Sequence, residues 1–215
     1  MLFIGRLFSL LIGYAFGLIQ TGFFVGRFNK IDIRQHGSGN SGSTNALRTM
    51  GLKAGIITFI GDLLKAVAAL LIVNAIFGKH NSDLAMVFKL YAGLGVVLGH
   101  DFPFYLDFKG GKGVASTLGI FLVIDWRIAL IPIIVFLVIT IFTKYVSLGS
   151  ITGMIIIAIE AFLFGSMGGI HVGTEYLPET YILIVLIVFM ALIRHKSNMK
   201  RLLKGTESRI GEKIS

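Results

Sequence analysis

The sequence predicts an all-α, polytopic membrane protein with about seven transmembrane helices, with its N-terminus outside and its C-terminus in the cytoplasm. Of the 215 residues, 55% are of the apolar types AVILMFWYC and only 14% are charged, and the mean hydropathy is +0.85. A soluble domain of this length could not cover its surface with so few charges. The apolar residues form long runs, and the basic residues gather in alternate loops. We interpret residues 1–215 as a single domain with a basic tail at 194–215.

The composition also excludes several kinds of chemistry. There are no cysteines, so disulfides, thiolate metal sites and thiol nucleophiles are ruled out. The formal net charge of +9 fits anchoring against anionic lipid head groups. No nucleic-acid partner is expected, because the basic residues lie in short loops rather than on a soluble face. We predict no metal and no cofactor, since no second His, Asp or Glu pair accompanies His100 and Asp101 with ligand spacing.

A helix that crosses the roughly 30 Å hydrocarbon core needs about 20 mainly apolar residues. The first apolar run continues past residue 20 without a small-residue cleavage site, so it is interpreted as a retained span. The last span is short on its face, and Leu177–Thr180 or helix tilt would lengthen it. The spans outside the middle of the chain are Leu2–Val25, Ala54–Phe77, Leu84–Phe104, Ile151–Phe164 and Tyr181–Ile193.

The middle run, Gly113–Phe142, is apolar except for Asp125-Trp126-Arg127. A single helix would place both charges near mid-bilayer, at a cost of several kcal/mol. Two shorter spans with a tight turn at Asp125–Arg127 avoid this cost. This choice gives about seven spans, and about five or six spans is the alternative.

The charges of the loops set the predicted orientation. Segments rich in Lys and Arg are expected to face the cytoplasm, and with seven spans this assignment alternates correctly. The basic segments are Gly26–Lys53, Asp107–Lys112, Thr143–Ser150 and Arg194–Ser215, and the segments poor in Lys and Arg are Gly78–Asp83 and Ser166–Thr180.

The first basic segment contains a stretch rich in Gly, Ser, Thr and Asn. Its glycines let backbone N–H groups turn toward an anion, and its polar side chains add donors. Arg48 can hold a phosphate through two hydrogen bonds. Residue type alone leaves an anion site and a flexible polar connector equally open. The residues concerned are Gly37, Ser38, Gly39, Asn40, Thr44, Asn45 and Arg48.

A second loop, Lys109-Gly110-Gly111-Lys112-Gly113, lies directly before an apolar helix. The loop amides and the positive end of the helix dipole would point at one spot, which favours phosphate binding. It is not a nucleotide P-loop, because glycine follows Lys112 and Leu106 stands where a P-loop has glycine. His100, shortly before the loop, is interpreted as a structural or substrate-orienting residue.

Two further segments are expected on the same side. Ser147-Leu148-Gly149-Ser150-Ile151 is predicted to be a short loop with Ser150 near the start of a span, and its simplest interpretation is helix capping. In the tail, His195 and Asn198 are three residues apart and share a helix face, although a basic tail by itself is more typical of a lipid-surface anchor. Within a predicted span, Asp62 and Lys65 are three apart and can pair.

These motifs resemble the bacterial integral-membrane glycerol-3-phosphate acyltransferases that use acyl-phosphate as donor. The match runs in order over essentially the whole chain, and its two departures are minor: Ser41 stands where proline is common, and Ser116 where threonine is common. The matching motifs are Gly37-Ser38-Gly39-Asn40-x-Gly42-x-Thr44-Asn45, Gly99-His100-x-Phe102-Pro103, Phe108-Lys109-Gly110-Gly111-Lys112-Gly113-Val114-Ala115, Ser147-Leu148-x-Ser150-Ile151, His195-x-x-Asn198 and Arg201-Leu202-Leu203-x-Gly205-Thr206-Glu207.

The resemblance implies a seven-helix enzyme of the bacterial inner (cytoplasmic) membrane with its active site facing the cytoplasm. It would transfer a fatty acyl group from acyl-phosphate to glycerol 3-phosphate, giving lysophosphatidate and inorganic phosphate in the first acylation step of phospholipid synthesis. The expected partners are these two substrates and membrane lipids, and we expect a monomer.

A mechanism follows as a hypothesis. No histidine has Asp five residues later, so the His-x-x-x-x-Asp dyad of other glycerolipid acyltransferases is absent. We expect direct transfer, in which a phosphate oxygen of the donor takes the proton, and an acyl-Ser38 intermediate is the rival mechanism. Ser38, His195 and Asn198 are the candidate catalytic residues, and Arg48, Lys112 and Lys109 would neutralise phosphate. The other substrate-binding candidates are Gly37, Gly39, Asn40, Thr44, Asn45, His100, Gly110, Gly111, Gly113, Ser147 and Ser150.

Two other classes of protein compete with an enzyme. A transporter or channel for a phosphorylated solute would show internal repeats and broken helices at mid-membrane, and no convincing repeat is found. A non-catalytic lipid-binding or scaffold protein would not need two separate loops that combine glycine with Lys or Arg.

Overall fold

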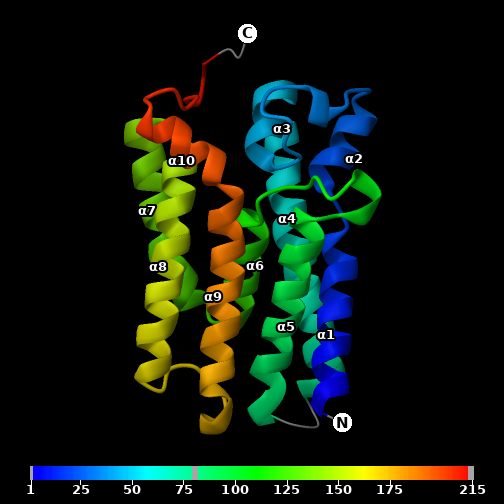
Figure 1. The fold of residues 1–215 in the computed structure, drawn as a ribbon, viewed down its shortest axis with the longest axis vertical. Coiled ribbons are helices and arrows are strands. Elements are labelled where there is room, and N and C mark those ends of the chain that lie inside the picture. The colour runs from blue at the N-terminus through cyan, green and yellow to red at the C-terminus, as the bar shows by residue number, and fades with distance from the viewer. Residues whose placement is uncertain (1, 79–81, 213–215) are drawn as a thin grey trace.

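The computed structural model describes residues 2–78 and 82–212. Residues 79–81 of the predicted loop Gly78–Asp83, with Lys79 among them, and the end of the tail from residue 213 lie outside these ranges. The described residues form a bundle of helices without strands (Figure 1). The α-helices are α1 Leu2–Gly17, α2 Thr21–Phe28, α3 Ser43–Met50, α4 Leu52–Val73, α5 Ser82–Asp101, α6 Val114–Ile124, α7 Trp126–Thr143, α8 Val146–Ser166, α9 Leu177–Arg194 and α10 Lys196–Leu203.

Short turns complete the described helices. Three are 3₁₀ turns, η1 Ile33–Gln35, η3 Phe104–Leu106 and η4 Thr174–Tyr176, and η2 Asn74–Gly78 is a π-helical turn. The short helices α3 and α10 lie at one end of the bundle, which we call the loop end (Figure 1).

The membrane character of the fold is confirmed. In the described residues, six helical segments are long and apolar enough to cross a bilayer. The helix α6 is apolar but has only 11 residues, about 16 Å of length or half the hydrocarbon thickness. The seven-span count and the orientation stay predictions. The six segments are Leu2–Phe28, Leu52–Gly78, Leu84–Leu106, Trp126–Thr143, Val146–Ser166 and Thr174–Arg194.

The predicted break in the middle run is confirmed as a helix boundary. The helix α6 ends at Ile124 and α7 begins at Trp126. The carboxylate of Asp125 accepts a hydrogen bond from the Arg127 N–H at 2.9 Å and pairs with the Arg127 guanidinium at 2.6 Å. These contacts cap α7, and the guanidinium holds the pKa of the Asp125 carboxyl below its ordinary value. The predicted extension of the last span is also confirmed, since α9 begins at Leu177.

Two predictions about local structure were wrong. The span Leu2–Val25 lies within a segment, Leu2–Phe28, that is long and apolar enough to cross a bilayer, but it is not one helix, because α1 ends at Gly17 and α2 begins at Thr21. The segment Ser147–Ser150 is not a loop, because α8 already begins at Val146 and the Ser150 hydroxyl donates to the Val146 carbonyl at 2.9 Å. The connection before α8 is short because Lys144, in the left-handed region at φ +63°, ends α7 at once.

Small residues bring α1 against α5. The buried residues of α1 are Gly5, Ser9, Gly13 and Gly17, spaced every four positions along one face. A Cβ on Gly13 would overlap the backbone of Ala92 in α5. The two backbones therefore touch, as in small-xxx-small contacts of membrane helices.

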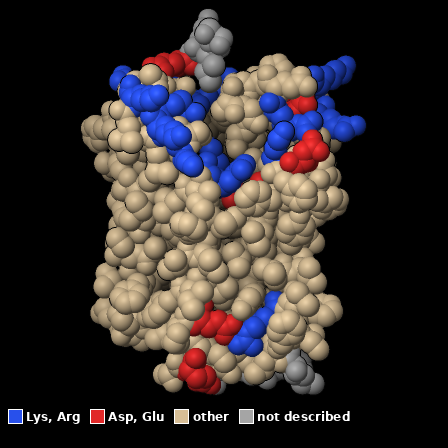
Figure 2. All heavy atoms as spheres, in the orientation of Figure 1, with Lys and Arg blue, Asp and Glu red and all other residues tan. Residues whose placement is uncertain are grey.

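The bundle has two parts. The helices α7 and α8 form a hairpin that contacts α6, α9 and α10. Figure 2 shows that Lys and Arg gather at the loop end, above a wide belt without charges. At the opposite end, Arg6 of α1 pairs with Glu179 of α9 at 2.6 Å, and Tyr91 of α5 donates to the same carboxylate at 2.9 Å.

The contact between α1 and α5 can be tested by adding one methyl group. We expect Gly13→Ala to destabilise the protein by about 1 to 3 kcal/mol, because the new Cβ must push the helices apart. Gly153→Ala in α8 is the matched control, since its Cβ would meet nothing closer than 3.5 Å and alanine favours a helix by up to about 1 kcal/mol. Thermal unfolding in detergent, followed by Trp126 fluorescence, measures both. Equal melting temperatures for the two variants would contradict the close approach.

Candidate active site

Two adjoining cavities open at the loop end, with volumes of about 120 Å³ and about 510 Å³. Together we call them the site cavity. The smaller one reaches Asp62 in α4 and His100 in α5, and the larger one is lined by loop and tail residues. All four segments that the sequence singled out therefore meet at one place. Both cavities are lined by Ser38, Asn40, Arg48, Lys112, Asn198 and Arg201.

The loop that carries Ser38 is held in shape by Asn45. The Asn45 side-chain oxygen accepts from the Ser38 N–H at 2.9 Å. Its amide nitrogen donates to the carbonyls of Ile33, His36 and Asn40. Both ends of this buried side chain are thus engaged inside the loop, so Asn45 positions Ser38 at the cavity.

The loop from Lys109 to Gly113, which we call the Gly-Lys loop, does not direct its glycine N–H groups toward an anion as predicted. The N–H groups of Gly110 and Gly111 donate to the carbonyls of Asp101 and His100 at 3.1 and 2.9 Å, so they are not free for an anion. The Arg194 guanidinium donates to the carbonyls of Gly110 and Gly111, each at 3.0 Å. The donors left for an anion are the first amides of α6, which have no partner inside the helix.

One hydrogen bond joins the two glycine-rich loops directly. The Asn40 amide donates to the Gly110 carbonyl at 3.1 Å, and the Asn40 side-chain oxygen accepts from the Gly42 N–H at 2.9 Å. Asn40 is thus held within its own loop and bound to the other loop, and these contacts fix the position of Ser38 relative to Lys112.

A chain of polar contacts crosses the site cavity to the tail. Lys112 Nζ donates to the Asn198 side-chain oxygen at 2.7 Å, and the Asn198 amide donates to Glu207 Oε1 at 2.6 Å. Arg201 Nε reaches the other oxygen of Glu207 at 2.7 Å. Because Glu207 can only accept, the carbonyl oxygen of the Asn198 amide is turned toward Lys112.

Burial sets the charges of these groups. It lowers the pKa of Lys112 to about 8, opposed by Glu207 and aided by neighbouring arginines. Burial, with the charge of Lys112, lowers the pKa of His195 to about 4, so its ring is neutral at pH 7. Burial alone would raise the pKa of Glu207, but hydrogen bonds from groups such as Asn198 and Arg201 outweigh it and hold that pKa below its ordinary value.

The neutral ring of His195 has a defined tautomer. Its Nδ1 lies 2.7 Å from the Ala191 carbonyl. A carbonyl only accepts, so Nδ1 carries the proton and Nε2 is left as an acceptor. A substrate hydroxyl in the cavity can donate to that nitrogen.

The tail after α10 folds back over the site cavity. An Arg48 NH2 donor binds the Ser208 carbonyl at 2.9 Å, while Arg48 Nε is buried without a hydrogen-bond partner. The Ile210 N–H donates to the Lys144 carbonyl at 2.9 Å. Arg48 thus binds the tail with one nitrogen while its side chain lines both cavities together with Lys112.

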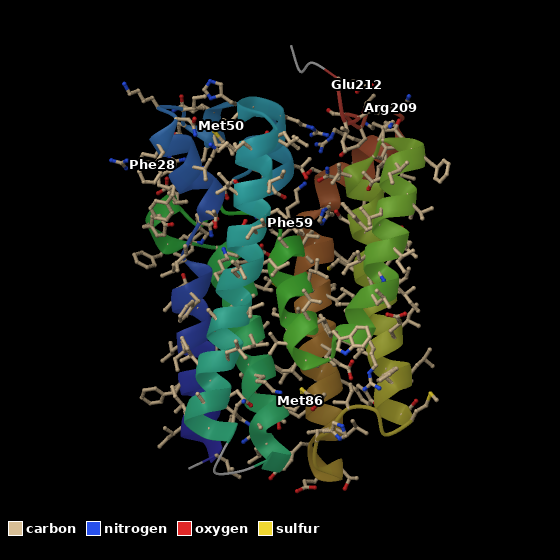
Figure 3. All side chains as sticks on the ribbon, turned by 180° about the vertical axis from the view of Figure 1, so that it is seen from behind. Phe28, Met50, Phe59, Met86, Arg209 and Glu212 are labelled. Atoms are coloured by element: carbon tan, nitrogen blue, oxygen red, sulfur yellow. The ribbon has the colours of Figure 1, made fainter. Side chains whose placement is uncertain are left out.

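One wall of the site cavity is apolar. Phe59 of α4, labelled in Figure 3, lines it together with Phe136 of α7 and Val146 of α8. An acyl chain can pack against this wall between α4 and the α7–α8 hairpin, with its polar head at the cations.

Most of the residues proposed from the sequence line the site cavity. Gly39, Gly110 and Gly111 do not line the cavity, and their role lies in the backbone conformation of the loops. Lys109 is exposed and outside the lining. The predicted residues that line the cavity are Gly37, Ser38, Asn40, Thr44, Asn45, Arg48, His100, Lys112, Gly113, Ser147, Ser150, His195 and Asn198.

Other lining residues were not proposed from the sequence. Arg201 and Glu207 belong to the tail motif but had no assigned role, and Asp62 was expected only to pair with Lys65. The signal for Asp62 was an acid inside a span, which by itself marks a functional position. Phe59 and Phe136 had no signal among so many apolar residues.

Comparisons with known proteins identify the family of the chain. Residues 7–205 match the family model described as Glycerol-3-phosphate acyltransferase. The chain is 42% identical over 211 residues to a glycerol-3-phosphate acyltransferase of Alkaliphilus metalliredigens, with 98% of each chain covered. It is 39% identical over 207 residues to one of Clostridioides difficile, with 94% of each covered.

Two solved structures have the same fold. They are crystal structures of PlsY (YgiH), an integral membrane glycerol 3-phosphate acyltransferase, in a glycerol 3-phosphate form and a lysophosphatidic acid form. The TM-scores are 0.82 and 0.80 and the identities 34% and 33%, with 96% of this chain covered in each case and 96% and 95% of the solved chains. Since the family model spans most of the chain and these relatives match it nearly end to end, the chain belongs to the glycerol-3-phosphate acyltransferase family.

Proposed function

We propose that this chain transfers a fatty acyl group from acyl-phosphate directly to a hydroxyl of glycerol 3-phosphate in the site cavity. As a member of its family, the chain is a membrane acyltransferase that acts on glycerol 3-phosphate. The observation that carries the rest is the mixed lining of the cavity: Arg48 and Lys112 line both of its parts, and apolar side chains that include Phe59 line the smaller part. An acyl chain that ends in a phosphate, and an acceptor that carries another, fit such a cavity.

The chemistry needs one bond made and one broken. The acceptor oxygen bonds to the acyl carbon, the bond from that carbon to the phosphate oxygen breaks, and inorganic phosphate leaves. The proton of the hydroxyl passes to a phosphate oxygen of the donor, so no side chain has to store it. His195 Nε2 and Ser38 orient the reacting groups. Arg48 and Lys112 offset the phosphate charge, and Asn198 is held toward Lys112 by Glu207.

The location is part of the same proposal. The excess of Lys and Arg at the loop end supports an orientation in which that end faces the cytoplasm from the inner membrane. The acyl chain then stays at membrane depth while both phosphates meet the cytoplasmic surface. We propose that a monomer suffices, because every residue assigned a role comes from one chain.

The donor can be identified by an acyltransfer assay. Purified protein should make labelled lysophosphatidate from radiolabelled glycerol 3-phosphate with acyl-phosphate, because the leaving phosphate has cations to meet it. With acyl-CoA the rate should be at background. Turnover with acyl-CoA alone would change the donor, and turnover with neither would contradict the proposed reaction.

Rapid-quench labelling separates direct transfer from an acyl-enzyme. With labelled acyl-phosphate and no acceptor, wild-type protein and Ser38→Ala should both show no covalent acyl label, because direct transfer never loads the protein. Activity of Ser38→Ala should fall roughly 10- to 100-fold, through lost orientation. A label trapped on wild type and missing from Ser38→Ala would establish the rival acyl-Ser38 route.

The pH dependence of substrate binding tests the role of Lys112. Its pKa of about 8 means that its charge disappears as the pH rises from 7.5 to 9.5, a range in which substrate phosphates are already dianions. The KM of the substrate whose phosphate Lys112 binds should therefore rise about tenfold over this range. Lys112→Arg stays charged and should give a flat profile. The same rise in both proteins would remove Lys112 from phosphate binding, and the substrate affected shows which phosphate it holds.

A further inference from the structure

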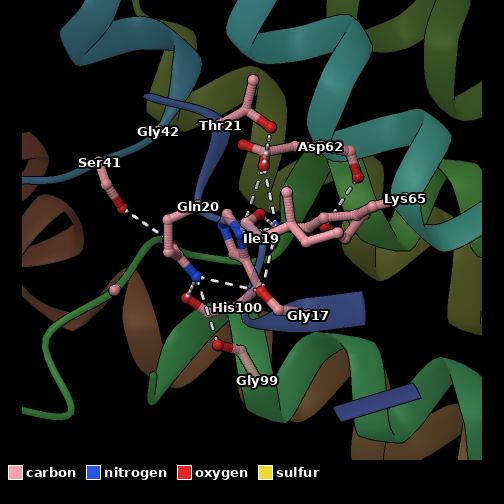
Figure 4. Close-up of polar contacts among 12 residues, drawn as sticks. Gly17, Ile19, Gln20, Thr21, Ser41, Gly42, Asp62, Lys65, Gly99 and His100 are labelled. Atoms are coloured by element: carbon pink, nitrogen blue, oxygen red, sulfur yellow. Dashed lines mark hydrogen bonds and ion pairs between the residues drawn. The ribbon is translucent and has the colours of Figure 1, made fainter. Parts of the chain in front are cut away.

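A buried polar cluster lies beneath the glycine-rich loops, at the break between α1 and α2 (Figure 4). It consists of Gln20, Asp62, Lys65 and His100, each 5% exposed or less. Asp62 and His100 touch the site cavity, whereas Gln20 and Lys65 do not line it. A buried charge within a span costs several kcal/mol unless its contacts compensate for lost water.

Lys65 holds the broken ends of the first span. Its Nζ pairs with Asp62 Oδ1 at 2.9 Å and donates to the Ile19 carbonyl at 2.7 Å, with a longer contact of 3.3 Å to the Gly17 carbonyl. The carbonyls of Gly17 and Ile19 lie at the break, where the regular helix no longer supplies them with donors. Lys65 thus stabilises the break with its charge and its N–H groups together.

Gln20, which lies at the break, connects it to the loop that carries Ser38. The Gln20 amide donates to the His100 carbonyl at 2.9 Å, and its side-chain oxygen accepts from the Ser41 hydroxyl at 2.9 Å. Ser41 lies three positions after Ser38, and it is only 1% exposed. A shift of the break would therefore move the Ser38 loop.

A second route leads from Lys65 to the Gly-Lys loop. Lys65 Nζ donates to His100 Nδ1 at 2.8 Å, which leaves the proton of the ring on Nε2. A Cβ on Gly111 would overlap that Nε2, so the ring lies directly against Gly111. Gly111 also donates its N–H to the His100 carbonyl at 2.9 Å. The His100 ring thus fixes the position of Gly111, the residue before Lys112.

We propose that Lys65 is a positioning residue for acyl transfer: through the break and Gln20 on one side and His100 on the other, it fixes the Ser38 loop relative to Lys112. Lys65 need not touch either substrate. The inference goes beyond the proposed reaction path, because it holds for direct transfer and for an acyl-Ser38 route alike and rests only on the activity of the family.

The test compares Lys65→Met with Gln20→Leu, neither of which alters a residue that lines the site cavity. In each purified, monodisperse variant we expect kcat/KM to fall roughly 10- to 100-fold. We also expect a higher KM for at least one phosphate substrate, because displaced loops can no longer bind both phosphates at the same time. A purely structural role would reduce the amount of folded enzyme, which scales kcat but leaves both KM values unchanged. Unchanged KM values would therefore overturn the proposal.

Lys89→Met is the matched control. Lys89 is a partly buried lysine of α5, 12 residues before Asp101 and so about 18 Å away along the helix. Its loss should leave both KM values at the wild-type level. An equal rise in KM for Lys89→Met would mean that any lost intramembrane lysine has this effect, and would overturn the proposal.

The double variant Lys65→Met/Gln20→Leu tests whether the two residues share one route. Their effects on kcat/KM should combine to clearly less than the product of the single effects, as for residues in one network. Fully multiplicative effects would contradict the route through Gln20. If Lys65→Met cannot be purified folded, Gln20→Leu alone decides, since wild-type KM values there would equally overturn the proposal.

Discussion

Backbone groups that leave a regular helix at membrane depth must find other partners, because lipid offers none. The active site of this chain depends on how that constraint is met. At the break in the first span, the carbonyls of Gly17, Leu18 and Ile19 accept from side chains of Lys65, Gln20 and Tyr105. In the Gly-Lys loop, Arg194 supplies donors to two further carbonyls. Irregular backbone can therefore exist beneath the loop end, inside an otherwise regular bundle.

The same constraint divides the cations between two tasks. Arg194 and Lys65 are directed at backbone carbonyls and shape the loops. Arg48 and Lys112 line both parts of the site cavity, and Glu207 contributes a negative charge to the lining of the smaller part. A residue count cannot separate these tasks, because both use the same side-chain types. The contacts of each nitrogen are what distinguish an organising cation from one available to a substrate.

Hydropathy and loop charge predicted most of the bundle, because spans must be apolar and about 20 residues long. The helix boundary at Asp125 was predictable from the same kind of argument, because two charges near mid-bilayer would cost several kcal/mol. The break after Gly17 was not: Gln20 and Thr21 are two polar residues within a long apolar run, and the break depends on Lys65, which lies far along the chain. The amides of Gly110 and Gly111 were likewise misjudged, since glycine content shows that a loop can turn but not which way its N–H groups point.

A broken first span is also a feature of transporters, yet here it has a local cause that begins with glycine. The strip of small residues on α1 brings Gly17 against Val96 and Gly99 of α5, close enough that a Cβ on Gly17 would overlap the Val96 carbonyl. This contact sets the end of α1 beside His100 and lets Gln20 reach the carbonyls of Gly99 and His100. Helix packing thus determines where the break lies, the break positions the loops, and the loops place Ser38 and Lys112 at the same cavity. Within the described residues the break supports an acyltransfer site at one end of the bundle, rather than a path through it.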